Sequence, residues 1–441
     1  MHLPRHPPGE SVLHTVLHWT YSAAFYLATP LILGYFAWRG LADRRYFAGW
    51  KARFGLPGAR PPAGGIVLHA VSLGEVNGAL PLLAALKARW PSLPLTLTTT
   101  TPSGMARARE CTGSEVHLQF LPLDLPGAMR RFLARLDPAL LIVMETEIWP
   151  NLFRTAERRG IPIVLVNARL SARSARGYRR LLPQARRALQ RTALVLAQST
   201  TDAERLRAAG APATRLEVTG NLKCDIELPA GLTEQGADLR RRLGERRLMW
   251  LAASTHPDEE SRLLAVHRRL QACFPGLLLV LIPRHPERSG RLVAAIESAG
   301  FRLGRHSRLT AEAAAVCDVL LVDALGVLLR YAAAVDVVFV GGSLVATIGG
   351  HNLLEPAALG KPVLIGPHHE NFAALTALLA DAGGAQVVGN VKALEDKLAA
   401  LLADPERRER QGNAARDAVH RARGAVARTI AALAPLLNRT P

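Results

Sequence analysis

The sequence predicts an α/β protein of two domains, each built around a parallel sheet. Short apolar runs alternate with helical stretches in two successive series along the 441 residues, a pattern typical of parallel sheets. A polar segment that contains proline and glycine, residues 227–245, separates the two series. A chain of this length is also sufficient for two domains with cores of their own. We therefore expect two Rossmann-like domains that are joined near residues 228–246.

The amino-terminal segment is predicted to be a membrane anchor. Residues 11–38 contain no Asp, Glu, Lys or Arg, and residues 21–38 are almost wholly apolar and aromatic. About 20 such residues suffice to cross a bilayer. Arg39, Arg44 and Arg45 follow the segment, and this excess of positive charge predicts that the bulk of the chain stays in the cytoplasm. A helix that lies in the membrane interface is the alternative that the sequence leaves open.

The strand candidates are short apolar runs that suit strands buried on both faces. In the first series they are residues 66–68, 95–98, 140–144, 163–166 and 194–197. In the second series they are residues 248–252, 277–282, 319–322, 337–340 and 363–365. The resulting domain boundaries are 1–45 for the anchor and its basic flank, 46–227 for the first domain, and 228–441 for the second domain with the carboxyl-terminal helices.

Polar residues follow several of these strands, at the edge where doubly wound sheets bind ligands. Glu75 begins a helix after the first strand, and Glu145 and Glu147 follow a later one. Lys223, in a chain whose positive residues are mostly arginine, precedes the linker. Arg284 follows a strand of the second domain, where an arginine suits a phosphate. These residues are the first candidates for a functional site.

Residues 341–370 contain the most informative pattern of the chain, a glycine-rich loop between a buried strand and a helix. The helix is expected to begin at His351 and to end at a C-cap on Gly360. Free N–H groups at a helix start favour a phosphate, and Asn352 and Glu355 add polar side chains in the first turn. We therefore predict an anion-binding site here. An ordinary strand–loop–helix unit is the alternative.

Residues 254–260, Ser-Thr-His-Pro-Asp-Glu-Glu, follow the first strand of the second domain. Hydroxyl groups followed by carboxylates are the arrangement that caps a helix start. Plain helix capping therefore explains this segment as well as ligand binding does.

The net charge of +19 arises from 55 Lys and Arg against 36 Asp and Glu. Nucleic acid, an anionic membrane surface or acidic substrates would each explain it, and so would scattered, solvated arginines. Nucleic acid is disfavoured because the arginines are spread over most helices, aromatic residues make up only 5%, and no zinc-finger, RNP or KH signature occurs. An anionic membrane surface remains among the expected partners.

The cysteines Cys111, Cys224, Cys273 and Cys317 lie far apart, without a Cys-x-x-Cys pair or a histidine in zinc spacing. Such cysteines are typical of reduced, structural thiols in a cytosolic compartment.

A set of motifs occurs in one order along the chain: HAVSLGEV, METEIWPN, NARLS, GNLKCD, STHPDEE, PRHPER and GGHNLLEPAALGKPVLIGP. In these motifs the sequence resembles the Kdo transferases, which move 3-deoxy-D-manno-oct-2-ulosonic acid (Kdo) from CMP-Kdo onto the lipid A precursor. The match runs from the anchor to about Phe372. The resemblance implies a GT-B fold, in which two Rossmann-like domains face each other across a cleft. It also implies an amino-terminal anchor and a catalytic body on the cytoplasmic side of the inner membrane.

The resemblance further implies the reaction and its catalytic residues. Kdo would pass to a hydroxyl of lipid IVA in lipopolysaccharide inner-core biosynthesis, with inversion and without a metal or a cofactor other than the donor. Glu75 is implied as the general base, and its position at a helix start is expected to keep it ionised. A role as a partner of the helix dipole is the alternative for Glu75. Glu145 and Lys223 are implied to stabilise the transition state, with Glu147 as the alternative to Glu145.

The CMP-binding residues that the resemblance implies lie in the second domain, and His285 is a further candidate among them. They are Pro283, Arg284, Leu325, Gly326, Val327, Asn352, Leu353, Leu354 and Glu355. The family has a Met-Gly-Glu turn where this chain reads Leu325-Gly326-Val327. Backbone contacts can persist there, but any hydrogen bond from the Glu side chain is lost.

Two other functions remain compatible with the sequence. One is a GT-B transferase or epimerase that uses a different nucleotide sugar, since glycine-rich strand ends and a ribose-binding Glu are widespread. The other is a non-catalytic, membrane-tethered protein that binds a nucleotide sugar, and Val327 is the feature that supports it.

Overall fold

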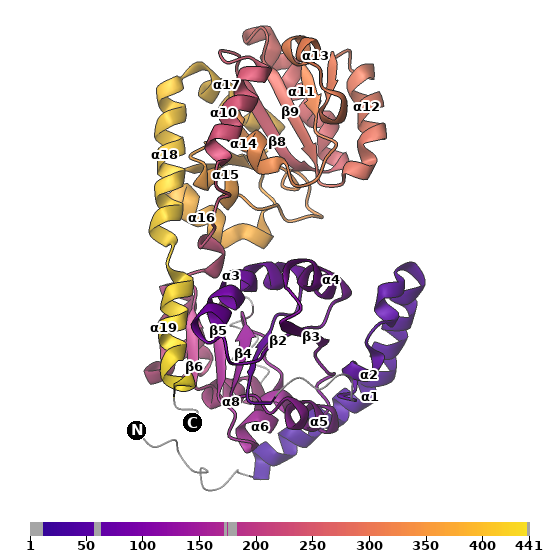
Figure 1. Cartoon of the computed structure of the whole chain (residues 1–441), viewed down its shortest axis with the longest axis vertical. Helices are drawn as coiled ribbons and strands as arrows, with labels where there is room; N and C mark the ends of the chain where they lie inside the picture. Colours follow the sequence, from indigo (N-terminus) through magenta and orange to yellow (C-terminus); the bar gives the residue numbers. More distant parts are fainter. Residues whose placement is uncertain (1–11, 57–62, 172–173, 175–182, 439–441) are drawn as a thin grey trace. The chain divides into compact units, whose positions relative to one another are not determined.

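The computed structural model describes residues 12–56, 63–171, 174 and 183–438. The chain separates into two compact units (Figure 1), of which the first contains residues 1–225 and 424–441 and the second contains residues 226–423. The chain leaves the first unit after Asp225, close to the domain boundary that the sequence predicts after residue 227.

A parallel sheet of seven strands, in the order β3-β2-β1-β4-β5-β6-β7, forms the centre of the first unit. Its strands are β1 (Ile66–His69), β2 (Leu95–Thr99), β3 (Val116–Phe120), β4 (Leu140–Met144), β5 (Ile163–Ala168), β6 (Leu194–Ala197) and β7 (Leu216–Val218). The α-helices described in this unit are α1 (Val12–Ala42), α2 (Trp50–Arg53), α3 (Leu73–Arg89), α4 (Pro102–Cys111), α5 (Pro126–Leu136), α6 (Pro150–Arg158), α8 (Pro183–Arg191), α9 (Thr200–Ala209) and α19 (Ala425–Leu437). The strand order reverses between β1 and β4.

Apolar side chains of the first sheet alternate between two layers, one on each face. Leu68 belongs to the layer that contains Val76 of α3. Its neighbour Val67 belongs to the opposite layer, with Phe132 of α5 and Phe153 of α6. Because successive residues of a strand point to opposite faces, a strand that is covered on both faces must be apolar throughout. This is why the central strands are recognisable in the sequence.

The second unit contains another parallel sheet of seven strands, in the order β10-β11-β9-β8-β12-β13-β14. Its strands are β8 (Met249–Thr255), β9 (Leu278–Pro283), β10 (Leu303–Arg305), β11 (Val319–Leu321), β12 (Val337–Val340), β13 (Val363–Ile365) and β14 (Ala385–Val387). Its α-helices are α10 (Leu232–Leu243), α11 (Pro257–Cys273), α12 (Ser289–Ser298), α13 (Ala311–Val316), α14 (Leu328–Ala334), α15 (Leu354–Ala358), α16 (Ala373–Asp381), α17 (Val391–Ala403) and α18 (Pro405–Ala422). Here the order reverses between β8 and β12. The prediction of two α/β domains with parallel sheets is confirmed.

Four strands, β3, β7, β10 and β14, were not predicted from the sequence, and they are the edge strands of the two sheets. An edge strand has one neighbour instead of two, and its side chains are less completely covered. β3 accordingly carries the polar residues His117 and Gln119, and β14 carries Gln386. Without a continuous apolar run, such strands lack the signal by which the central strands were found.

The carboxyl-terminal helix α19 belongs to the first unit, whereas the sequence analysis assigned it to the second domain. Ala425, Leu433 and Leu437 lie in the same apolar layer as Leu68, and α19 contacts α3. Asp225 fixes the start of α19, because its carboxylate accepts hydrogen bonds from the N–H of Gly424 and of Val426, both at 2.5 Å. The chain thus returns to its first unit after completing the second, and no local sequence pattern records this.

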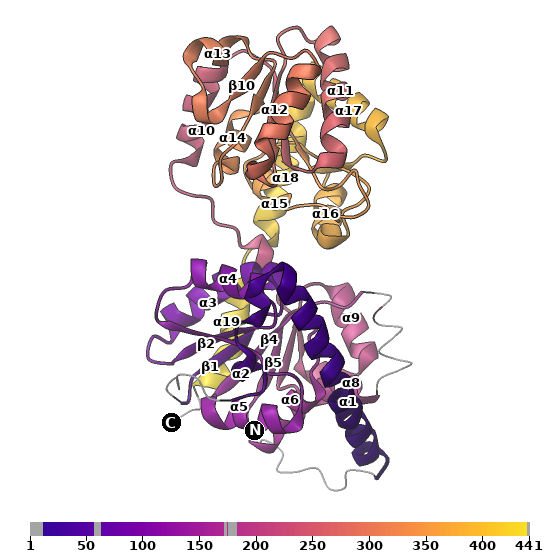
Figure 2. The same ribbon diagram turned by 90° about the vertical axis from the view of Figure 1, so that its right-hand side faces the viewer.

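Helix α1 lies along the surface of the first unit (Figure 2). Its residues Val16–Ala42 are long and apolar enough to cross a membrane by length and composition. The predicted amino-terminal helix is therefore present, as a candidate for membrane attachment.

Candidate active site

Three predicted catalytic residues of the first unit follow its sheet at the carboxyl edge. Glu75 lies in the first turn of α3, directly after β1, and Glu145 follows β4. Lys223 lies in the short 3-10 helix Leu222–Cys224, which contacts α3. Because β1 and β4 flank the point where the strand order reverses, these residues occupy the position where doubly wound sheets bind ligands.

The carboxylate of Glu75 is held by the residues that precede α3. Its Oε2 accepts a hydrogen bond from the N–H of Val71 at 2.8 Å, and its Oε1 accepts one from the hydroxyl of Ser72 at 3.2 Å. Neither bond caps an N–H group of α3 itself, and the alternative role of Glu75 as a partner of the helix dipole rests on its place in the first turn. Both bonds orient the carboxylate and leave further lone pairs on its oxygens.

Burial raises the pKa of Glu75 to about 7, and the nearby charges of Glu145 and Glu147 add to this effect. The bonds from Val71 and Ser72 act in the opposite direction and do not compensate. The helix start therefore does not hold the pKa of Glu75 at or below its ordinary value, because desolvation outweighs the effect of the helix end. A pKa near neutrality leaves this carboxylate able to take up a proton at neutral pH.

Glu145 connects two cationic side chains. Its Oε2 lies 2.7 Å from Nε of Arg169, and its Oε1 lies 3.7 Å from Nζ of Lys223. The backbone of Glu145 has a φ of 55°, which is uncommon for a residue with a side chain and ends the strand geometry of β4. Strained backbone of this kind clusters at functional sites.

Lys223 lies beside α3 at Gly78, which is one helical turn after Glu75. A Cβ built on Gly78 would be 3.3 Å from Cε of Lys223, so the helix passes close to the lysine stem. The structure therefore brings Glu75, Glu145 and Lys223 together within the first unit. Arg169, which the sequence analysis quoted within the NARLS motif without a role, joins them through Glu145.

Glu147, the alternative to Glu145, is also partly buried. Burial raises its pKa, and the charge of Glu145 raises it further. The ion pairs of Glu145 with Arg169 and Lys223 make Glu145 the carboxylate that is integrated into the cluster.

In the second unit, the glycine loop after β12 packs against the end of β8. A Cβ on Gly341 would lie 2.9 Å from the carbonyl oxygen of Ser254, so only glycine fits there. Gly342 has a φ of 66°, and its N–H donates to Oε2 of Glu259 at 2.6 Å. The expectation of a bare loop is correct, but the N–H of Gly342 is occupied by a carboxylate of α11.

The helix after this loop is shorter than the sequence suggested. α15 begins at Leu354 instead of His351 and contains five residues, although Gly360 follows it with the expected left-handed φ of 69°. Loop residues, rather than a helical turn, precede α15. Among them, the side-chain oxygen of Asn352 accepts a hydrogen bond from the N–H of Leu354 at 3.1 Å. So short a helix does not provide the phosphate site that was expected from a helix end.

Asn352 and Glu355 nevertheless form a defined polar pair, with Nδ2 of Asn352 donating to Oε1 of Glu355 at 3.1 Å. Burial raises the pKa of Glu355, and the bond from Asn352 opposes this shift. The second carboxylate oxygen of Glu355 has no protein partner in the described part of the chain, so it can accept a ligand hydroxyl. Leu353 and Leu354, the two residues between them, are buried and support the pair from the core.

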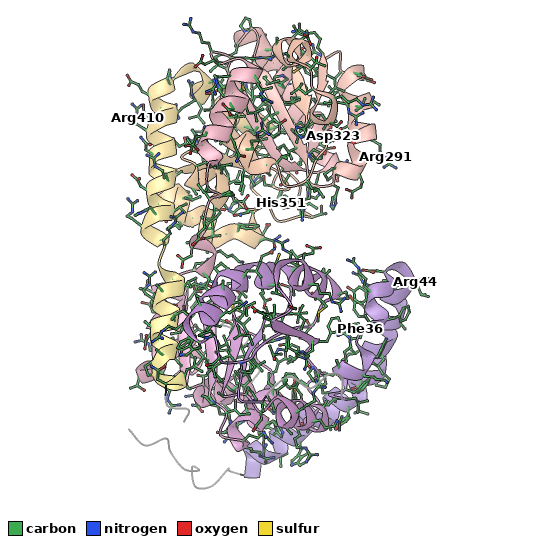
Figure 3. All side chains as sticks on the ribbon, in the orientation of Figure 1. Phe36, Arg44, Arg291, Asp323, His351 and Arg410 are labelled. Carbon is green, nitrogen blue, oxygen red and sulfur yellow. The ribbon has the colours of Figure 1, made fainter. Side chains whose placement is uncertain are left out.

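Pro283 ends β9, and the exposed Arg284 follows it. A group of histidines accompanies Arg284. Nε2 of His256 and Nε2 of His351 share a hydrogen bond at 2.8 Å, and the ring of His285 lies 6.0 Å from that of His256. Burial lowers the pKa of His351 to about 4, and the charges of His256, Arg284 and His285 lower it further. Figure 3 shows His351 at the lower edge of the second unit, on the loop that precedes α15.

Sequence reasoning missed His256 and His351 as site residues. His256 lies in the motif STHPDEE, directly after the Ser-Thr pair that suggested capping. His351 lies in the motif GGHNLLEPAALGKPVLIGP. In the structure His256 is the N-cap residue of α11 but makes no capping bond with its side chain, since its ring bonds to His351 instead. A pair of histidines 95 positions apart gives no signal in a single sequence.

The predicted third CMP contact, Leu325-Gly326-Val327, forms the turn before α14. Leu325 is 76% exposed, and Gly326 has a φ of 78°. No hydrogen bond links this turn to Arg284, Asn352 or Glu355, all of which the structure describes. The exposed Leu325 and Gly326 are consistent with the expected backbone contact, whereas the carbonyl of Val327 already accepts the N–H of Tyr331 at 3.3 Å. The contact with CMP remains a prediction.

In the part of the chain that the structure describes, no three side chains of His, Cys, Asp or Glu gather so as to hold a metal ion. The polar groups of both sites are instead cations, histidines and paired carboxylates.

Comparison with known proteins identifies the family. The family model described as 3-deoxy-D-manno-octulosonic-acid transferase (kdotransferase) matches residues 48–226. The 3-deoxy-D-manno-octulosonic acid transferase of Haemophilus influenzae is 39% identical over 424 residues, which cover 95% of this chain and 98% of that protein. The enzyme of the same name from Bordetella pertussis is 40% identical over 428 residues, which cover 94% of this chain and 98% of that protein. The chain belongs to the 3-deoxy-D-manno-octulosonic acid transferase family.

As a Kdo transferase, the protein is a glycosyltransferase. Its fold also resembles that of a UDP-N-acetylglucosamine 2-epimerase from Listeria monocytogenes, with a TM-score of 0.56, 15% identity, and coverage of 86% of this chain and 98% of that one. At this identity the likeness concerns the fold alone. It agrees with the expected GT-B architecture, in which each unit is a Rossmann-like domain.

Proposed function

We propose that this Kdo transferase moves Kdo from CMP-Kdo to a hydroxyl of the lipid A precursor, lipid IVA, in lipopolysaccharide inner-core biosynthesis. The observation that carries the proposal is the cluster of Glu75, Glu145 and Lys223 at the carboxyl edge of β1 and β4. The reaction is a single displacement with inversion that uses no metal.

Glu75 is the general base in this mechanism. The acceptor hydroxyl attacks the anomeric carbon of Kdo, its proton passes to Glu75, and the bond from that carbon to the phosphate oxygen of CMP breaks. A pKa near 7 supports this role, because a base is most effective when its pKa lies near the working pH. The bonds from Val71 and Ser72 hold the carboxylate in one orientation.

Glu145 and Lys223 stabilise the charges that develop during the displacement. Positive charge develops at the anomeric carbon, where a carboxylate such as Glu145 is favourable, and negative charge develops on the departing phosphate, which Lys223 attracts. Arg169 holds Glu145 from the other side and adds a second cation. We expect Arg169 to orient Glu145 rather than to contact Kdo.

The second unit binds the donor through its CMP group. Arg284 contacts the phosphate together with Pro283 and His285, and the carboxylate of Glu355 accepts the ribose hydroxyls, positioned by Asn352. Leu353 and Leu354 complete the CMP-binding surface. Leu325, Gly326 and Val327 supply backbone contacts to CMP. Cationic and neutral polar groups in these places explain why the mechanism needs no Mg²⁺.

The reaction takes place at the inner membrane, with the catalytic units on its cytoplasmic side. The apolar helix α1 supports membrane association, and the arginines that follow it suit the anionic surface of the cytoplasmic leaflet. An anionic bilayer surface is the corresponding partner.

The experiment is incubation of the full-length protein with a tetraacylated lipid A precursor and CMP-Kdo generated in situ, followed by mass analysis of the lipid. We expect a mass gain of one or more Kdo units that persists in EDTA and is lost in Glu75→Gln, while CMP binding by that variant is retained. An unchanged lipid mass with the wild-type protein contradicts the proposed acceptor and donor. Loss of transfer when EDTA is added after the CMP-Kdo has been formed contradicts the metal-independent mechanism.

Two controls separate the alternative functions. Competition between CMP-Kdo and UDP-sugars identifies a transferase or epimerase that uses another nucleotide sugar. A protein that binds CMP-Kdo without turnover is the non-catalytic alternative, and Val327→Glu tests whether the altered turn is the cause.

A further inference from the structure

The inward face of α1 makes specific polar contacts with the body of the first unit. The hydroxyl of Tyr21 donates to Oδ2 of Asp124 at 3.0 Å, and the buried hydroxyl of Ser22 donates to Oδ1 of Asn151 at 3.0 Å. Asp124 also accepts the N–H groups of Asn151 and Leu152 at the start of α6, both at 2.9 Å. The middle of the apolar segment is therefore bonded to a polar network of the body.

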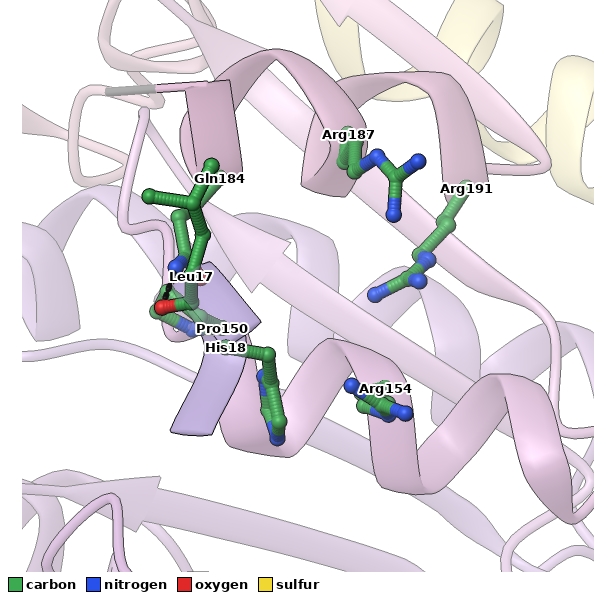
Figure 4. A pocket seen from close by; sticks show the side chains of 7 residues that line it. All are labelled: Leu17, His18, Pro150, Arg154, Gln184, Arg187 and Arg191. Atoms are coloured by element: carbon green, nitrogen blue, oxygen red, sulfur yellow. Dashed lines mark hydrogen bonds between the residues drawn. The ribbon is translucent and has the colours of Figure 1, made fainter. Parts of the chain in front are cut away.

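Contacts continue toward both ends of the helix. The guanidinium of Arg53, which is 1% exposed, lies between the rings of Phe36 on α1 and Phe120 on β3, 4.4 and 4.5 Å from their centroids. Figure 3 shows Phe36 directed from α1 toward the sheet. At the other end, the side-chain amide of Gln184 on α8 donates to the carbonyl of Leu17 (Figure 4). α1 thus contacts the body near Leu17, at Tyr21 and Ser22, and at Phe36, while most of its side chains remain partly or fully exposed.

The outward face of α1 is an exposed apolar stripe, which we call the outer stripe. Its members recur at helical spacing and include several aromatic residues of the kind that favour membrane interfaces. They are Val16 (51% exposed), Trp19 (63%), Tyr26 (52%), Leu27 (80%), Leu31 (77%), Tyr35 (50%), Trp38 (65%) and Leu41 (83%). Together they form a large apolar surface that faces away from the protein.

These contacts are incompatible with a helix that crosses a bilayer. A crossing helix needs about 20 residues within the hydrocarbon, and such a segment would include Tyr21, Ser22 and Phe36. Their partners Asp124 and Arg53 would then enter the hydrocarbon as well, at a high cost in free energy. An interfacial helix avoids this cost, because the body remains in the aqueous phase on one side.

We propose that α1 lies in the plane of an anionic bilayer surface, with the outer stripe inserted at the boundary between headgroups and acyl chains. Both faces of α1 are apolar because one packs on protein and the other on lipid. Positive charge lies at the carboxyl end of the helix and complements anionic headgroups. The exposed Arg39 lies in the last turn of α1, and the exposed Arg44 and Lys51 follow shortly after it.

Vesicle binding tests the outer stripe without depending on the proposed reaction. The full-length protein is mixed with vesicles of phosphatidylglycerol and phosphatidylethanolamine or of phosphatidylcholine alone, and bound protein is measured by flotation. We expect the variant Leu27→Ser/Leu31→Ser/Leu41→Ser to lose at least about tenfold in partitioning into the anionic vesicles. The matched control Val316→Ser/Val387→Ser removes exposed apolar side chains of the second unit, 51% and 43% exposed, and should bind as the wild type does.

A helix that crosses the membrane and a helix that lies on its surface place the amino terminus on different sides of the membrane relative to the body. A protease-sensitive tag at the amino terminus of the full chain should be cleaved only in inverted membrane vesicles, on the same side as a tag at the carboxyl terminus. Cleavage of the two tags from opposite sides would show that α1 spans the membrane and would overturn the proposal. Unchanged vesicle binding by the triple variant, or a soluble dimer that forms through α1 in place of binding to lipid, would overturn it too. Thermal unfolding verifies that the variants remain folded.

Discussion

The carboxylate of Glu259 in α11 accepts a hydrogen bond from the N–H of Gly342 at 2.6 Å, and this bond joins the helix that follows β8 to the glycine loop that follows β12. Glu259 is fully buried, and its second oxygen has no hydrogen-bond partner. Burial raises its pKa to about 7, against the effect of the Gly342 bond. Burial of a carboxylate with one unpaired oxygen costs free energy, and we infer that Glu259 is retained because it positions the loop.

Replacement of Glu259 should make the stability of the second unit less dependent on pH. Because the folded pKa of about 7 lies above the ordinary value of 4.5, the contribution of Glu259 to stability is fully present below pH 4.5 and is lost as the pH rises to about 7. Glu259→Gln keeps an oxygen for Gly342 and removes the ionisation. We expect this variant to gain up to about 3 kcal/mol over the wild type at pH 8 and nothing at pH 4.5, measured by denaturant unfolding.

Removal of the Glu259 carboxylate should weaken the binding of CMP. Glu259→Ala loses the bond to Gly342, so CMP affinity should fall by about tenfold, as expected for one hydrogen bond. Glu259→Gln should bind CMP as the wild type does. Equal affinities of both variants in calorimetry would show that Glu259 does not position the loop for the nucleotide.

The rate of transfer should follow the ionisation of Glu75. A base acts in its deprotonated form, so kcat/KM should rise with pH through an apparent pKa of about 7 and level off above it. Glu75→Gln should reduce the rate by about 10²- to 10⁴-fold above the pKa of Glu75, and its residual rate should no longer follow this ionisation. A pH profile that stays flat between pH 5.5 and 8.5 would mean that another group limits the proton transfer.

Gly78 should be important for catalysis although it is not a catalytic residue. Gly78→Ala adds a Cβ 3.3 Å from Cε of Lys223 and should displace the lysine from Glu145. Alanine is the better helix former, so the stability of α3 should be unchanged or higher by up to about 1 kcal/mol. We therefore expect a lower kcat without a lower Tm.

Gly74→Ala is the matched control for this prediction. It lies on the same helix, and its nearest neighbour would be the Ser72 hydroxyl at 3.9 Å. If both alanine variants lose activity equally, the effect does not act through Lys223.

Burial of His351, beside the charges of His256, Arg284 and His285, should make the second unit sensitive to acid. Because the folded pKa of His351 is about 4, below the ordinary value of 6.5, its contribution to stability is complete above pH 6.5 and is lost as the pH falls toward 4. His351→Gln should reduce this loss by about 1–3 kcal/mol between pH 7 and pH 4.5. The difference in Tm between variant and wild type at the two pH values measures it, and an identical pH dependence would contradict the assignment.

The sequence alone determined the class of the fold and its central strands. Val67 and Leu68, or Val337 to Val340, are apolar because both faces of a central parallel strand are buried, and burial leaves a local pattern. It also placed Glu75 and Glu145 after strands, because a strand end and a helix start are both local. The motifs identified the family for the same reason, since they are contiguous.

Only the tertiary structure decided the features that depend on distant neighbours. The edge strands β3, β7, β10 and β14 became visible through pairing, and α19 returned to the first unit through Asp225. The pairs Glu145–Arg169 and His256–His351 join separate segments. The pKa of Glu75 depends on how deeply the surrounding fold buries it, and a helix start cannot set it alone. The sequence records which residues must be buried or must turn, whereas contacts and electrostatics arise only once the folded chain brings distant groups together.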